Sequence, residues 1–237
     1  MPIKFRFGWI PFIGTMVAVA IGISLGQWQM RRAAEKEAIE QRLNAREAAP
    51  QVLFSGEQCS ADEMEYRRVV VRGEFVPEWT VYLDNRPHNG AAGFYVMTPL
   101  KVVGTNLHVL VARGWAKRDM RDRAKLPPTP MPTGIIEIQG VARNNPGRLL
   151  QLGSDEPLHQ NAILQNLDVQ TFAQHSHLTV APFIVEQSNN TKDGLVRDWP
   201  RPSSGVDKHR GYAFQWYALA ATAFVFFLVT GLRRGRA

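Results

Sequence analysis

One histidine near the C-terminal end is the residue best placed to do chemistry. If a helix begins near His209, the residues three, four and seven positions later are Tyr212, Ala213 and Trp216. An imidazole, a gap and two aromatic rings then share one helix face. Neutral imidazole is a nitrogen ligand of metal ions, and this face suits a flat macrocycle. The alternative is an ordinary aromatic belt, with the histidine as one more polar residue at a membrane–water interface.

The belt alternative arises because the chain has two apolar runs, one near each end. Residues 211–232 contain no charged side chain, and as a helix they reach roughly 33 Å, enough to cross the hydrocarbon core of a bilayer. Residues 9–30 form the other run, which follows Lys4 and Arg6 and precedes no convincing signal-peptide cleavage site. We therefore expect both runs to be membrane-spanning helices.

Small residues recur every four positions in the first run, at Gly14, Ala18, Gly22 and Gly26. This stripe predicts a smooth helix face on which another helix packs closely, although glycine that merely tolerates lipid would look the same. The G-x-S-x-G pattern around Ser24 resembles a hydrolase nucleophile turn, but that turn needs a strand before it and a helix after it. Inside a spanning helix the match is accidental.

Two spans place both termini on one side of the membrane and the long middle segment on the other. Basic residues flank both runs on both sides, so the positive-inside rule alone does not decide the orientation. Because long domains translocate largely regardless of charge, we expect the termini in the cytoplasm and the domain outside. No Arg- and Ser-rich transit peptide precedes Trp9, which favours a bacterial plasma membrane.

The middle segment changes from a helical to a strand pattern at Pro50. Short stretches rich in β-branched and aromatic residues, separated by Pro, Gly and Asn, predict an antiparallel sheet or a partly open barrel. One helix is expected within it, opened by Asn166 or Asp168. The predicted strands cover residues 66–76, 79–87, 93–103, 107–118, 134–143 and 181–187.

The predicted fold class is a membrane protein of α+β type. Two transmembrane helices flank an extracytoplasmic, antiparallel β-rich domain with one or two helices. The expected segments are a cytoplasmic tail (1–8), the first transmembrane helix (9–30), a helical stalk (31–50), the β-rich domain (51–187), a linker (188–210), the second transmembrane helix (211–232) and a second cytoplasmic tail (233–237).

Composition and missing motifs argue against several classes of protein. The net charge is +7, but much of the excess flanks the apolar runs, so no nucleic-acid partner is expected. The single cysteine, Cys59, excludes an intramolecular disulfide and any two-cysteine metal or redox motif. Without a Walker loop, G-x-G-x-x-G or H-E-x-x-H, the chain is predicted not to be an enzyme. The histidines expected to be structural or exposed are His88, His108, His159, His175 and His177.

Five motifs, in order and with spans at both ends, resemble the Surfeit locus protein family of cytochrome oxidase assembly factors. They are "LGQWQMRRAAEK" (residues 25–36), "YRRVVVRGEF" (66–75), "LDNRPHNGAAGFYVMTPL" (83–100), "VLVARGWAKRD" (109–119) and "HRGYAFQWYALA" (209–220). The family usually carries an asparagine just before the histidine. Here Val206, Asp207 and Lys208 stand in its place, so the resemblance leaves open whether an amide contacts the imidazole.

The resemblance implies a role in assembling haem–copper oxidase, with haem a handled on its way to the catalytic subunit. It implies that His209 is a ligand of haem a iron, and Tyr212 and Trp216 are the companions expected from the helix face. The expected partners are the catalytic subunit of cytochrome c oxidase, membrane lipid and, as a further candidate, the haem a synthase. The expected location is the bacterial inner membrane, with both termini cytoplasmic and the domain periplasmic.

Two other functions compete with haem handling. A purely structural assembly factor would grip an oxidase subunit without touching haem. Copper delivery or thiol chemistry is the third class, but Cys59 alone supports it poorly because Cu(I) sites need paired soft ligands.

Overall fold

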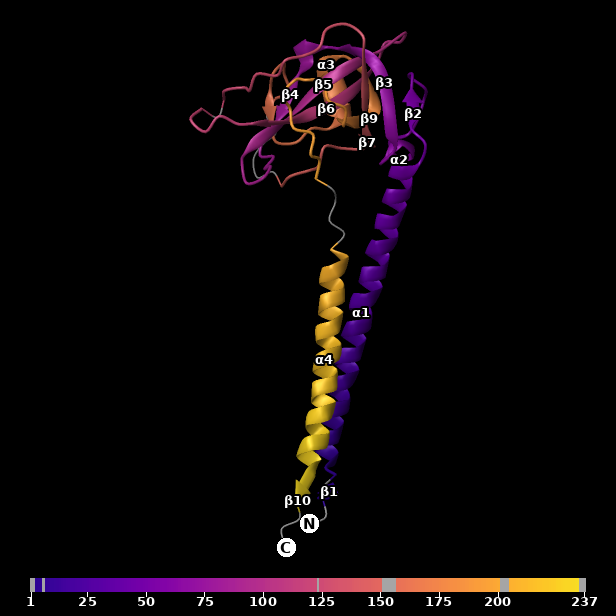
Figure 1. Ribbon diagram of the computed structural model, residues 1–237, viewed down its shortest axis with the longest axis vertical. Helices are drawn as coiled ribbons and strands as arrows, with labels where there is room; N and C mark the ends of the chain where they lie inside the picture. Colours follow the sequence, from indigo (N-terminus) through magenta and orange to yellow (C-terminus); the bar gives the residue numbers. More distant parts are fainter. Residues whose placement is uncertain (1–2, 6, 123, 151–156, 201–204, 235–237) are drawn as a thin grey trace. The chain divides into compact units, whose positions relative to one another are not determined.

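In the computed structural model the chain forms two compact units. Figure 1 shows the chain coloured along its sequence. Residues 1–42 and 202–237 form one, called here the helix unit, and residues 43–201 form the other, called the β-domain. The structure describes residues 3–5, 7–122, 124–150, 157–200 and 205–234.

Two helices make up most of the helix unit. They are α1 (Trp9–Ala48), whose last turns belong to the β-domain, and α4 (Val206–Gly231). Both are long and apolar enough to cross a membrane by length and composition. The strands β1 (Ile3–Phe5) and β10 (Leu232–Arg234) pair antiparallel beside the two chain ends (Figure 1). Because α4 begins at Val206, ahead of the apolar run, His209 lies inside the helix.

The two helices pack antiparallel through buried residues that recur every four or seven positions. On α4 the buried positions include Val206, Ala213, Ala220 and Phe227, which recur every seven residues. Such spacing is that of coiled-coil packing, in which facing side chains interlock. The buried positions on α1 are Gly22, Gly26 and Ala33.

The predicted stripe of small residues is right in part. A Cβ on Gly26 would overlap the Tyr217 ring, and one on Gly22 would lie 2.9 Å from Cβ of Ala220, so both glycines allow close approach. Gly14 is exposed, with nothing within 4 Å of an added Cβ, and the prediction is wrong there and at Ala18. Four residues advance about 400° around a helix, so an i+4 stripe drifts away from the contact that the 3.5-residue spacing follows.

Five strands of the β-domain close into a barrel, in the order β3, β7, β9, β6, β5 and back to β3. Neighbours are antiparallel except β6 and β9, which are parallel. The barrel closes because β5 pairs with β4 along its first half and with β3 along its second. The bounds are β2 (Val52–Phe54), β3 (Arg68–Phe75), β4 (Val81–Leu83), β5 (Gly93–Val102), β6 (Leu107–Lys117), β7 (Ile136–Arg143), β8 (Ile163–Leu164) and β9 (Thr179–Gln187).

Apolar side chains cover both faces of the central strands. One core fills the barrel and includes Val71, Leu100 and Phe183. A second core lies on the other face of β5, β6 and β9, where Phe172 of α3 (Val169–Ser176) packs. This is why β5 and β6 read as nearly continuous apolar runs, with almost every residue buried.

Capping side chains set the ends of the short helices. Asp168 caps α3 by accepting a hydrogen bond from the Thr171 amide at 3.0 Å, which decides between the two predicted starts. A further helix, α2 (Ala61–Met64), begins with a capping box formed by Ser60 and Glu63. A 3-10 turn, η1 (Pro77–Trp79), precedes β4.

Candidate functional site

His209 lies in the first turn of α4, and its imidazole is tied to α1. Nδ1 of His209 lies 2.7 Å from Oε1 of Gln29, and both side chains are half-buried. An amide oxygen only accepts hydrogen bonds, so this contact is a hydrogen bond when Nδ1 carries the proton, as it does in the tautomer that leaves the lone pair on Nε2. Nε2 bonds no other residue in the described part of the chain. In that tautomer Nε2 is the nitrogen of the ring that is able to ligate a metal ion.

This contact supplies an amide that the sequence motif lacked. Although Val206, Asp207 and Lys208 replace the asparagine expected before the histidine, Gln29 provides the acceptor from the opposite helix. Sequence reasoning missed Gln29 because 180 positions separate the two residues. The signal in the sequence was the position of Gln29 itself, a polar residue near the end of the first apolar run.

The aromatic neighbours of His209 differ in how far they are exposed. Trp216 is half-buried and Ala213 only 1% exposed, so the expected gap at Ala213 is filled by helix packing. Tyr212 is 53% exposed. The roles of Tyr212 and Trp216 stay predictions.

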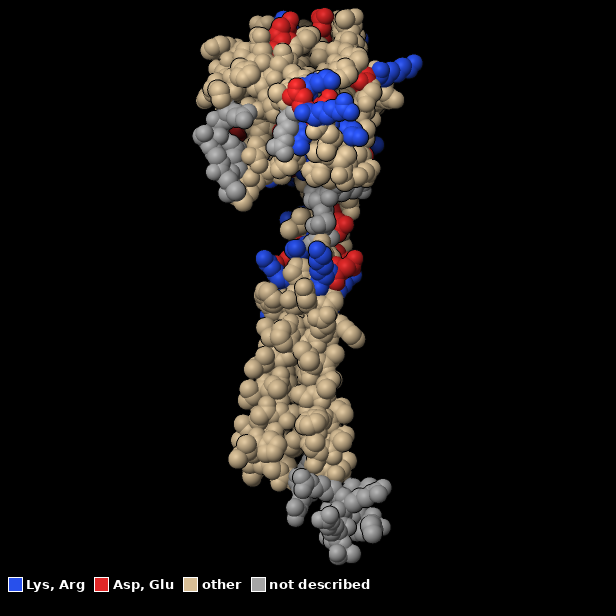
Figure 2. Space-filling view, turned by 90° about the vertical axis from the view of Figure 1, so that its left-hand side faces the viewer, with Lys and Arg blue, Asp and Glu red and all other residues tan. Residues whose placement is uncertain are grey.

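Charged side chains gather at one end of the apolar stretch of the helix unit, as Figure 2 shows for one face, and Lys208 and Arg210 are the sequence neighbours of His209. Arg210 Nη2 lies 2.9 Å from Glu37 Oε2 in an exposed ion pair between the helices. Lys208 is exposed and has no ion pair with another described residue. Along α4, His209 thus stands between the exposed Lys208 and the exposed apolar side chains that follow it.

The remaining histidines do not form a metal site. No group of three His, Cys, Asp or Glu side chains suited to a metal lies within the residues that the structure describes. His175 bonds the Thr171 carbonyl at 2.9 Å, while His177 ends α3 in a left-handed conformation. The other three also have local partners: His88 packs on Trp115, His108 bonds Thr179 and His159 bonds Gln160.

Cys59 is poorly suited to thiol chemistry. Burial raises the pKa of its thiol, and the neighbouring carboxylates of Glu63 and Glu57 raise it further. The thiolate is the reactive form, so this environment suppresses nucleophilic attack and metal binding.

The Arg-Gly-Trp motif of β6 has a structural role. The Trp115 indole donates a hydrogen bond to the Arg86 carbonyl at 2.7 Å, and Gly93 leaves space for the ring, which a Cβ there would overlap. Gly114, at φ +153°, lets the segment around Val196 lie directly against β6. Residues of the motifs at 83–100 and 109–119 thus contact each other directly.

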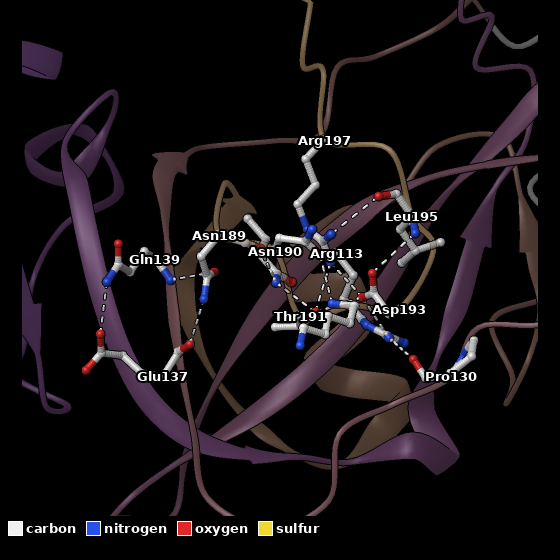
Figure 3. Close-up of polar contacts among 12 residues, drawn as sticks. Arg113, Pro130, Glu137, Gln139, Asn189, Asn190, Thr191, Asp193, Leu195 and Arg197 are labelled. Atoms are coloured by element: carbon white, nitrogen blue, oxygen red, sulfur yellow. Dashed lines mark hydrogen bonds and ion pairs between the residues drawn. The ribbon is translucent and has the colours of Figure 1, made fainter.

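Arg113 of the same motif belongs to a buried cluster of charges, drawn in Figure 3. Its Nη2 lies 3.2 Å from Oδ2 of Asp193, and Nη2 of Arg197 lies 2.6 Å from the same oxygen. Thr191 also donates to this oxygen, and Arg113 donates to the Pro130 carbonyl. The cluster therefore fastens two loop segments to the barrel.

The groups in this cluster shift one another's pKa values. Burial acts to raise the pKa of Asp193, but hydrogen bonds from Arg197, the Leu195 amide and Thr191 outweigh it and hold the pKa below its ordinary value. Burial lowers the pKa of the Arg113 guanidinium, while Asp193 opposes that shift. The carboxylate of Asp193 thus compensates the charges of both Arg113 and Arg197.

A second charged cluster lies where β7 meets β9. Glu186 Oε2 is 3.7 Å from Nη1 of Arg143, whose Nε is 3.5 Å from Oε1 of Glu65. Burial raises the pKa of Glu186 to about 7, with Arg143 opposing the shift and Glu65 adding to it. The guanidinium of Arg143 thus lies close to two carboxylates, those of Glu65 and Glu186, in a largely buried position.

We expect this shift to make stability depend on pH. The pKa of Glu186 is about 7 in the folded protein and 4.5 in the unfolded chain, so between these pH values the folded protein binds more protons than the unfolded chain. The free energy of unfolding therefore falls as pH rises through that window. Glu186→Gln should remove this loss and stabilise the protein above pH 7 by up to about 3 kcal/mol. Unfolding of the full chain in detergent at several pH values measures it. The exposed Glu137→Gln is the control, and an identical pH dependence in wild type and Glu186→Gln would refute the effect.

Comparisons with known proteins agree with the five motifs. The model of the SURF1 family matches residues 16–221. "SURF1-like protein" of Rickettsia felis is 26% identical over 221 residues, covering 90% of this chain and 93% of that protein. "Surfeit locus protein 1" of Xenopus tropicalis is 24% identical over 219 residues, covering 85% and 70%. "Cytochrome oxidase assembly protein SHY1" of Saccharomyces cerevisiae is 30% identical over 118 residues, covering 48% and 30%.

The match extends across the features described above. It includes most of both long helices, the whole barrel, the Arg113 cluster and the His209–Gln29 pair. Agreement over the matched range, together with relatives aligned over most of their own length, shows that the chain belongs to the SURF1 family.

Proposed function

We propose that this protein is an assembly factor of haem–copper oxidase that holds haem a or delivers it to the catalytic subunit. Oxidase assembly is supported by family membership and by the name of the yeast relative. Haem a handling goes further, and the observation that supports it is the imidazole of His209, with Nδ1 bonded to Gln29 and Nε2 open. No catalytic role is proposed.

The surroundings of His209 fit the chemistry of haem a. Imidazole nitrogen is the common protein ligand of haem iron. The isoprenoid tail of haem a belongs in hydrocarbon, which the exposed apolar side chains of α4 would border. Its carboxylates belong at the water interface, where Lys208 is unpaired among the described residues and Arg210 already pairs with Glu37. The iron, tail and carboxylates thus each find a suitable group.

A scaffold function without haem is the second candidate. The contact with Gln29 could serve only to fix the register of the helices, since a polar pair in an apolar interface has that effect. The Tyr217 ring packs on Gly26, which accounts for one of the interfacial aromatic residues without a ligand. The scaffold would recognise an oxidase subunit through surfaces of the helices or the barrel.

An absorption spectrum separates these candidates. We expect protein purified from cells that make haem a to carry haem and to show a Soret band. The same protein from cells lacking the haem a synthase should lose the haem a spectrum. Purified wild-type protein without any haem, from cells with intact haem a synthesis, would favour the scaffold.

We further propose a bacterial inner-membrane location, with the barrel in the periplasm and both termini in the cytoplasm. The two apolar helices and the antiparallel return of the chain support this arrangement. Alkaline phosphatase fused after Asn190 should be active, whereas phosphatase fused after the last residue should be inactive. The reverse pattern would contradict the orientation and move His209 to the cytoplasmic interface.

A further inference from the structure

We infer that Gln29 is a positioning residue for His209, which holds the Nδ1–H tautomer and presents Nε2 to the incoming iron. This inference rests on the proposed function, because it assigns a role within the same haem site. The geometry that carries it is the 2.7 Å contact between Oε1 of Gln29 and Nδ1 of His209.

The surrounding packing keeps this contact in place. On α1, Gln29 stands between Gly26 and Ala33, and on α4, His209 stands between Val206 and Ala213. These four neighbours are buried, and three of them are small. The helices therefore approach closely enough for a glutamine side chain to span the gap. Side-chain hydrogen bonds join α1 and α4 at two places among the described residues, and the other, Glu37 to Arg210, is exposed.

The choice of an amide matters for the chemistry. In neutral imidazole one nitrogen carries the proton and the other is the potential ligand, and the partner of the protonated nitrogen selects which is which. An acceptor oxygen on Nδ1 therefore directs coordination to Nε2. Histidine ligands commonly donate their second N–H in this way, which orients the ring and strengthens its donation to the metal. An amide does so without adding a negative charge beside the apolar helices.

The first arm of the test needs no haem. Nitrogen NMR of ¹⁵N-histidine-labelled full-length protein in lipid nanodiscs, at about pH 8 where ordinary imidazole is neutral, reports the tautomer of His209. We expect the Nδ1–H form in the wild type, a mixture of tautomers in Gln29→Met, and the Nδ1–H form again in Gln29→Glu, which retains an acceptor oxygen. Gln27→Met is the control, because Gln27 is exposed on the same helix. A wild-type Nε2–H form would overturn the inference.

The second arm measures haem binding and its reduction potential. Gln29→Met should weaken haem a binding by about 10- to 100-fold, the usual effect of removing a residue that supports a metal ligand, and should raise the reduction potential. Gln27→Met should match the wild type. If the wild type binds haem through His209 while Gln29→Met keeps its affinity and potential, Gln29 only pins the helices and the inference is wrong. If the wild type shows the Nδ1–H tautomer but binds no haem a, the contact between Gln29 and His209 is real, whereas the proposed function is wrong. The role of Gln29 in haem binding is then wrong as well.

Discussion

Replacing Asp193 with alanine should lower the free energy of unfolding of the β-domain by about 3–5 kcal/mol, because it removes one partner from a buried ion pair. The side chains of Arg113 and Asp193 are 0% and 1% exposed. Without the carboxylate, Arg113 and Arg197 would remain buried as two cations that repel each other. This loss approaches the total free energy of unfolding of a marginally stable small domain.

Denaturant unfolding of the full chain in detergent, followed by tryptophan fluorescence, measures this effect. Asp193→Asn should also destabilise strongly, since it keeps the shape and removes the charge. Asp198→Ala is the matched control from the same segment, and its exposed carboxylate predicts a change within about 0.5 kcal/mol. Equal stability of the Asp193 and Asp198 variants would show that the buried cluster contributes nothing.

Gly26→Leu should separate the two helices without preventing their insertion into the membrane. The Cβ alone would overlap the Tyr217 ring, and the rest of the leucine has no space in the packed interface. Overpacking of this kind costs about 1–3 kcal/mol. Hydrophobicity cannot recover the loss, because lipid is as apolar as leucine. Since Gln29 lies one turn further along α1, its contact with His209 should break as well.

The expected result is a normal amount of protein in the membrane with reduced assembly of active oxidase. Gly14→Leu is the matched control, because an added Cβ at Gly14 meets nothing within 4 Å. Quantitative blotting and oxidase activity in cells that carry each variant measure both quantities. Wild-type oxidase activity with Gly26→Leu would show that close packing of α1 and α4 is dispensable.

Local sequence patterns predicted most elements of the fold. Apolar length located both long helices, and runs of β-branched residues located the five barrel strands, because these signals depend on neighbouring residues. Two- and three-residue strands such as β2 and β8 were missed, since they are too short to show a period. The closure of the barrel was missed too, because it depends on β5 dividing its pairing between β3 and β4.

The side chains that define the sites were harder to predict, because their partners are distant in sequence. Arg113 lies in one of the recognised motifs, but its anion lies 80 positions away in a segment that reads as a polar linker. His209 was identified from its spacing before an apolar run, whereas Gln29 could not be linked to it without the helix register. The same lack of register led to the wrong assignment of Gly14 and Ala18 to the packed face.

The optical spectrum of His209→Ala tests most directly the proposal that this residue holds haem a. Protein carrying this change, purified from cells that make haem a, should lose most of the bound haem or show a shifted Soret band, because the iron is left with water or a weaker donor. Trp216→Ala should weaken binding less, since it removes packing surface and keeps the ligand. His175→Ala and His177→Ala should match the wild type. An unaltered Soret band in His209→Ala, together with its loss in another histidine variant, would contradict the assignment.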